Sequence, residues 1–142
     1  MTAPQAPPQP RTFRVSQLRG AYVLQMTSTV GRQRGDRVLA DVTIGSDSGG
    51  TATVRGRWPA YFSLTRDSAH RGNLDILFDD TRRLSFILGN PHLRTTDTGV
   101  ILDVFTVDKQ MIVGRWVDGG LGVDARSGLH PQGWFCLQRR LP

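Results

Sequence analysis

The chain has 142 residues, a formal net charge of +6 and a hydrophobic fraction of 38%, with 16 glycines and 8 prolines. This length suffices for one domain with its own core, and no apolar run reaches the roughly 18 residues of a membrane-spanning helix. Every acidic residue is aspartate and Lys109 is the one lysine. Because glutamate and lysine are strong helix formers, this composition disfavours a helical fold.

The N-terminal segment has the composition of an unfolded tail. Four prolines lie within the first ten residues, among glutamine, alanine and threonine. We therefore predict a disordered Pro-rich tail over residues 1–11 and a single domain over residues 12–142. The segment 12–18 is expected to form a short helical turn or a lead-in strand, in which Phe13 and Leu18 plug one end of the domain.

From Gly20 onward, apolar and polar side chains alternate with a period of two, which is typical of half-buried strands. The spacing of about ten residues per strand predicts eight or nine strands, a number at which an antiparallel sheet can close. We therefore predict an all-β fold, a single antiparallel up-and-down β-barrel of about eight strands. The alternating segments are 22–27, 38–44, 52–58, 74–78, 84–88, 111–116 and 135–139.

The segment 100–107 differs from the others because it is apolar on both faces. A strand with this pattern is expected to be covered on its outer side by a loop, by the tail or by a partner. Turn residues separate the strands, with Asp-Ser-Gly-Gly at 47–50 and Val-Asp-Lys-Gln at 107–110. The longest irregular segment, 118–131, contains four glycines and interrupts the last hairpin.

Two Gly-x-Trp phrases, at 56–58 and 114–116, stand out as a repeat. Each is followed by a strand with Phe and Leu at alternate positions, at 62 and 64 and again at 135 and 137. We predict that each phrase forms a hairpin in which the glycine lets the indole ring fold over a neighbouring strand. This arrangement indicates a closed or strongly curled sheet.

The ends of the domain resemble a calycin-type barrel, the group that includes lipocalins and avidins. Those proteins open with a Gly-x-Trp strand and close with a strand whose arginine packs across that ring. Here Gly20-Ala21-Tyr22 stands in the opening position, with Tyr in place of Trp, and Arg139 or Arg140 stands in the closing one. The resemblance implies a barrel sealed at one end that binds a small apolar or amphipathic molecule in its mouth, and many lipocalins are exported.

The predicted interior is rich in aromatic side chains, as a small-molecule pocket requires, although the same residues would suit a packed core. We favour non-enzymatic binding of a small hydrophobic or amphipathic molecule in the barrel. The predicted ligand-binding residues are Tyr22, Met26, Trp58, Phe62, Phe78, Phe86, Trp116 and Phe135.

Two other functions remain as alternatives. The first is a protein-interaction or structural module that uses the strand 100–107 and the loop 118–131, with a homo-oligomer as the simplest form. The second is a basic surface that binds a polyanion or nucleic acid. Nucleic acid is less favoured because bases stack on exposed rings, whereas the aromatic side chains are predicted to point inward. The arginines of this surface would be Arg55, Arg57, Arg82, Arg83 and Arg115.

Catalysis is the least favoured function. His70, His92 and His130 share no metal-ligand spacing with another His, Cys or acid, so we predict neither a metal nor another cofactor. Cys136 alternates with buried positions and has no base nearby, and it cannot form an internal disulfide. An isomerase or cyclase with one aspartate base stays an alternative. No signal-peptide pattern begins the chain, which favours the cytoplasm, while export as a mature form remains compatible.

Overall fold

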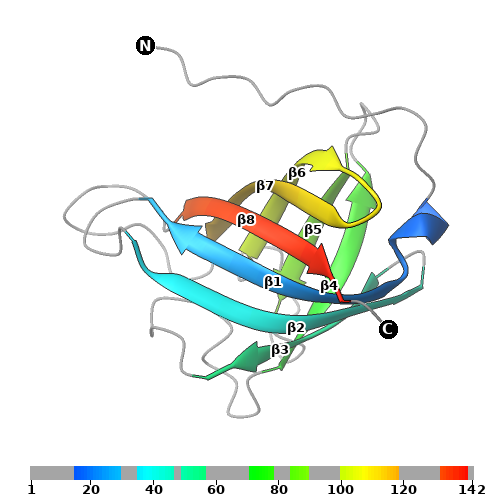
Figure 1. Ribbon diagram of the computed structural model, residues 1–142, viewed down its shortest axis with the longest axis horizontal. Coiled ribbons are helices and arrows are strands. Elements are labelled where there is room, and N and C mark those ends of the chain that lie inside the picture. Colours follow the sequence, from blue (N-terminus) through cyan, green and yellow to red (C-terminus); the bar gives the residue numbers. More distant parts are fainter. Residues whose placement is uncertain are drawn as a thin grey trace.

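The computed structural model describes residues 15–29, 35–46, 49–56, 71–78, 84–89, 100–118 and 132–140. The predicted tail lies outside these ranges. Each strand pairs antiparallel with the next one in sequence, and β8 pairs with β1, so the sheet closes (Figure 1). The predicted all-β up-and-down barrel of eight strands is therefore confirmed. The elements are η1 (Val15–Leu18), β1 (Gly20–Ser28), β2 (Arg37–Ser46), β3 (Gly49–Arg55), β4 (Arg71–Phe78), β5 (Leu84–Gly89), β6 (Val100–Val107), β7 (Met111–Asp118) and β8 (Gln132–Arg139).

The core is the barrel interior, and it follows from the two-residue period of the strands. Alternate side chains of a strand point to opposite faces, so every second residue faces the lumen. The buried hydrophobic residues are Leu18, Tyr22, Leu24, Met26, Val38, Ala40, Val42, Ile44, Ala52, Leu74, Ile76, Leu84, Phe86, Leu88, Val100, Leu102, Val104, Ile112, Trp116, Phe135 and Leu137.

Two details of the strands differ from the sequence prediction. The predicted turn at 47–50 is shorter, because Gly49 and Gly50 already belong to β3 and pair with β2 and β4. The strand β6 contains a bulge between Val104 and Thr106, so Phe105 and Thr106 both stand outside and Val107 packs against the core. Sequence alternation cannot anticipate an inserted residue of this kind. The predicted turn at 107–110 is confirmed, since the Asp108 carboxylate accepts hydrogen bonds from two following backbone amides.

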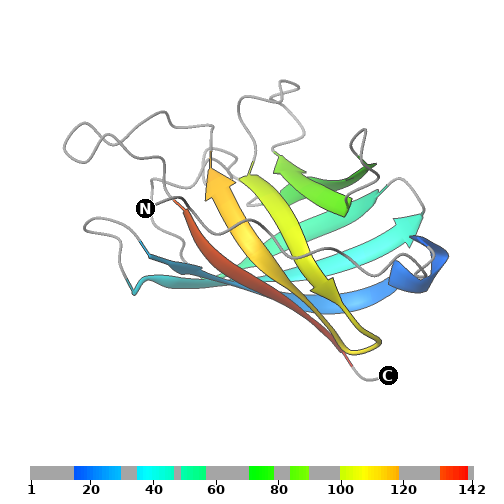
Figure 2. The same cartoon turned by 90° about the horizontal axis from the view of Figure 1, so that it is seen from above.

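The two ends of the barrel differ in their connections. At one end the strands are joined by the segments 47–48, 79–83 and 108–110; at the other by 29–36, 56–70, 90–99 and 119–131. In Figure 2, η1, the β6–β7 turn and the C-terminal end of β8 all lie at the first end. We call these the short-turn end and the long-connection end. No helix in the described ranges is long and apolar enough to cross a membrane.

Candidate functional site

The candidate site lies inside the barrel, toward the long-connection end. Three residues of neighbouring strands form one register row there: Trp116 of β7 pairs with Gly133 of β8, and Gly133 pairs with Ser28 of β1. All three face the interior, and Trp116 has no solvent-exposed surface. In the other direction, the row continues through Leu102 to Phe86.

The Trp116 ring crosses over Gly133 to reach β1. Its Nε1 donates a hydrogen bond to the backbone carbonyl of Thr27 at 3.1 Å, two strands away. This crossing requires glycine at position 133, because an added Cβ would overlap the Thr27 carbonyl and lie 2.8 Å from the Trp116 Nε1. A buried indole usually finds such a hydrogen-bond acceptor, and here the bond fixes the ring across two strands.

The second Gly-x-Trp phrase therefore differs from the prediction in the glycine that makes room for the ring. The ring does fold over a neighbouring strand, but the glycine beneath it is Gly133 and not Gly114. Gly114 instead makes room for Phe135, its cross-strand partner, whose ring atom Cε1 would lie 2.7 Å from an added Cβ. The first phrase extends beyond Gly56 into residues that the structure does not describe.

Ser28 is the polar residue of this row and was not among the predicted site residues. Its side chain is 2% exposed, and its Oγ has no hydrogen-bond partner among the described residues. Its backbone is satisfied by Asp36 and Gly35, at 2.8 and 2.9 Å. Burying a hydroxyl without a partner is unfavourable, so such a group in a native structure calls for an explanation. Because Ser28 continues the alternation that begins at Tyr22, its inward direction could have been read from the sequence.

At the short-turn end, one arginine, Arg139, contacts η1, β1 and the β6–β7 turn. The Arg139 guanidinium lies over the Tyr22 ring at 4.9 Å and donates hydrogen bonds to the Tyr22 hydroxyl and to the carbonyls of Gln17, Arg19 and Lys109. The Tyr22 hydroxyl in turn donates to the Leu18 carbonyl at 2.6 Å. Burial raises the pKa of Tyr22, and the Arg139 charge offsets part of this rise. Leu18, in the predicted plug segment, is buried beside this cluster.

The predicted ligand-binding residues are thus divided between two ends. Phe86 and Trp116 share one row, and Phe135 and Met26 form part of the next row toward the short-turn end. Tyr22 lies at the opposite, short-turn end. Trp58, Phe62 and the side chain of Phe78 lie outside the described part of the chain.

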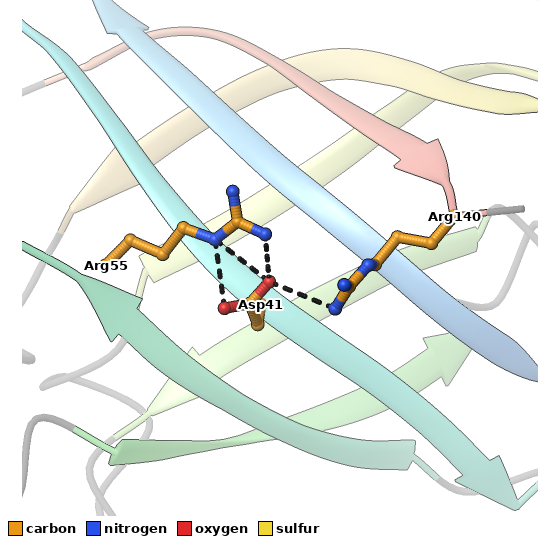
Figure 3. A network of polar contacts seen from close by, with 3 residues as sticks. All are labelled: Asp41, Arg55 and Arg140. Carbon is orange, nitrogen blue, oxygen red and sulfur yellow. Dashed lines mark hydrogen bonds and ion pairs between the residues drawn. The ribbon is translucent and has the colours of Figure 1, made fainter.

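On the outer surface, the predicted polyanion residue Arg55 is engaged with a carboxylate. Its Nε lies 3.0 and 2.9 Å from the two oxygens of Asp41, and Nη1 of Arg140 approaches the same carboxylate at 3.5 Å (Figure 3). Arg115 is exposed and donates to the Gln132 side chain at 2.8 Å. Since Arg55 already holds an anion, it is a weaker phosphate ligand than the sequence indicates. Arg57, Arg82 and Arg83 lie outside the described residues.

The Asp41–Arg55 pair is expected to make the stability of the fold depend slightly on pH in acid. Hydrogen bonds from Arg55 lower the pKa of Asp41 below its ordinary value, and the Arg55 and Arg140 charges act in the same direction. The pair therefore contributes stability above the unfolded-state pKa of about 4, and this contribution is lost as the pH falls through the lower folded pKa. We expect a small effect, because both side chains are about two-fifths exposed. Urea unfolding at neutral and acidic pH should show a slightly smaller acid loss in Arg55→Gln than in wild type, whereas Arg37→Gln should behave as wild type.

Groups for catalysis or metal binding are sparse in the described part of the chain. Within those residues, no three His, Cys, Asp or Glu side chains gather to hold a metal ion. Cys136 is half-buried on the outer side of β8, where burial and the Asp108 carboxylate raise the pKa of its thiol. A raised pKa lowers the thiolate fraction and hence the nucleophilicity of this residue. The three histidines lie outside the described residues.

Comparisons with known proteins add little to this geometry. No protein-family model and no curated protein matches the chain. A solved structure described as a redesigned β-barrel is similar, with a TM-score of 0.48 and 10% sequence identity over 89% of this chain and 95% of that chain. The assignment as a closed barrel rests on the strand pairing of the chain itself.

Proposed function

We propose that this protein is a calycin-type barrel that binds a small amphipathic molecule at the long-connection end of its interior, without transforming it. The ligand would place an apolar body beside Trp116 and one hydroxyl or carbonyl group on Ser28. Apolar surface supplies most of the affinity in sites of this kind, and a rare polar group supplies orientation.

The Ser28 hydroxyl is the observation that carries this proposal. In an interior lined by hydrocarbon and aromatic side chains, it is buried and lacks a partner among the described residues. A ligand oxygen would satisfy it, and the Trp116 ring shares its register row. Met26 in the next row has an unbranched and flexible side chain, which can move to accommodate a ligand.

The difference between the two ends of the barrel also supports a binding site at the long-connection end. Arg139 over the Tyr22 ring matches the closing contact that the calycin resemblance implies, and it occupies the short-turn end. The four longer segments of sequence join strands at the opposite end, where β1 ends at Ser28 and β7 ends shortly after Trp116. Loops carried by a rigid scaffold are frequent sites of binding. The ligand is therefore proposed to enter from the long-connection end.

The substitution Ser28→Ala tests this proposal. Without ligand, the variant should be as stable as wild type or more stable by about 1 kcal/mol, because it removes a buried hydroxyl that has no partner among the described residues. Native mass spectrometry of protein from its own host should reveal a retained ligand. A panel of long-chain alcohols and ketones should raise the melting temperature of wild type, and less so that of Ser28→Ala.

Matched ligands and a matched residue serve as controls. Alkanes of equal length should bind wild type and Ser28→Ala equally, since they offer no group to the hydroxyl. Thr27→Ala, at the adjacent outward position, should bind the alcohols as wild type does. The proposal fails if no lipophilic compound shifts the melting temperature. It also fails if Ser28→Ala binds the alcohols as tightly as wild type does.

A further inference from the structure

The outer surface of the barrel has two unlike sides. On β2 and β3 most of the outward side chains are polar, including the exposed residues Thr43, Thr51 and Thr53, and Leu39 is the apolar exception. On β5 to β8 many are apolar, and three of them, Ile101, Met111 and Trp134, are 43%, 40% and 55% exposed. Exposed apolar side chains that lie together on one face can mark an interaction site. We call this second side the apolar face, which comprises Ile87, Ile101, Phe105, Val113, Val117 and Trp134.

Trp134 shows that the predicted inward direction of the aromatic side chains does not hold throughout. It stands on the outside and packs edge-to-face against Phe105 of β6, with ring centroids 5.7 Å apart. This contact covers part of the β6 strand that was predicted to need a cover. Ile101 of the same strand remains exposed, so the cover is incomplete.

One pair of opposite charges lies among the residues of the apolar face. In one outer row, Arg115 of β7 pairs with Asp103 of β6. In the neighbouring row of the same two strands, Val117 pairs with Ile101. Each row thus holds complementary residues on either side of the line between β6 and β7, a cation beside an anion and one aliphatic side chain beside another.

From this order we propose that the apolar face binds a second copy of this chain, as a two-fold dimer whose axis runs between β6 and β7. A two-fold axis in the interface places each β7 residue opposite a β6 residue of the other chain. Arg115 then faces the partner subunit's Asp103, and Val117 faces the partner subunit's Ile101, each contact occurring twice. Two sheets can pack face to face in this way with strands within about 30° of each other.

The same pattern argues against other occupants. An anionic membrane surface or a polynucleotide would gain little attraction from Arg115, because the Asp103 carboxylate lies beside it, whereas a second copy places an opposite charge over each of the two residues. Trp134 lies one strand beyond Arg115 and would reach over β5 of the second copy. Exposed tryptophans that become buried are frequent anchors of protein interfaces. This inference does not depend on ligand binding in the interior.

Charge reversal tests both the dimer and its axis. Sedimentation velocity over a wide concentration range should show a dimer of the wild-type chain. Arg115→Asp and Asp103→Arg should each weaken dimerisation at least about tenfold, because each places like charges opposite one another. An equimolar mixture of the two variants should recover the dimer, since opposite charges then face each other at both contacts. The two substitutions combined in one chain should recover it as well.

Controls separate this result from misfolding. Each single variant places like charges side by side within its own sheet, so circular dichroism and thermal melts must first show that it is folded. Thr51→Asp, on the polar side, should dimerise as wild type does. A wild-type chain that stays monomeric at all concentrations would overturn the proposal. A mixture of folded variants that remains monomeric, or single variants that dimerise as wild type, would also overturn it.

Discussion

Gly133→Ala is expected to destabilise the barrel by about 3 kcal/mol or more, which for a domain of this size lowers the melting temperature by about 10 °C. The added methyl group would overlap the Thr27 carbonyl oxygen and crowd the Trp116 Nε1. Neither can move freely, because the carbonyl belongs to β1 and accepts the indole hydrogen bond. Thermal and urea unfolding would measure the loss, and near-ultraviolet circular dichroism would report the displaced indole.

The control for this substitution is Gly89→Ala in β5. An added Cβ at Gly89 meets no atom of the described residues within 4 Å, so the same chemical change should leave stability nearly unchanged. The difference between the two variants then isolates the close approach at Gly133 from the general effect of removing a glycine. Equal stabilities for the two variants would contradict the crossing of Trp116 over β8.

Arg139→Met is the second substitution with a large expected effect, also about 3 kcal/mol. The guanidinium joins the end of β8 to three backbone carbonyls, of Gln17, Arg19 and Lys109, and to the Tyr22 hydroxyl. Methionine retains much of the side-chain volume and loses all of these hydrogen bonds. Arg139→Lys should recover little of the loss, because one ammonium group cannot reproduce the planar fork that reaches partners on η1, β1 and the β6–β7 turn.

Two measurements distinguish Arg139 from an ordinary surface arginine. Arg140→Met, at the next position, should change stability by less than about 0.5 kcal/mol, since its ion pair with Asp41 is exposed and 3.5 Å long. A spectrophotometric titration should show a further rise in the Tyr22 pKa in Arg139→Met, because the Arg139 charge lowers this pKa in the wild-type chain. An unchanged tyrosine titration would mean that the guanidinium does not lie over the ring.

Much of the barrel could be predicted because the two-residue period repeats in nearly every strand. The inward positions of Tyr22, Met26, Phe86, Trp116 and Phe135 all follow from counting alternate residues, and all five are buried. The resemblance of the chain ends to a calycin-type barrel also predicted the contact between Tyr22 and an arginine of the last strand.

Several features of the structure could not be predicted by counting alternate residues. Gly133 supports Trp116 because the two residues pair across strands, and pairing depends on register, which a single sequence does not encode locally. The bulge in β6 shifts every later residue of that strand by one face. The outward direction of Trp134, by contrast, does follow from its alternation with Phe135.

The sequence by itself determined that this chain forms a closed sheet with an apolar lumen, since alternation decides which face of each strand avoids water. Only the tertiary structure decided which residues of distant strands become neighbours. The rows Trp116–Gly133–Ser28 inside and Arg115–Asp103 outside each join strands through backbone pairing. Closure of the barrel then brings β1 beside β8, so that a hydroxyl near the start of the chain shares a row with an indole near its end.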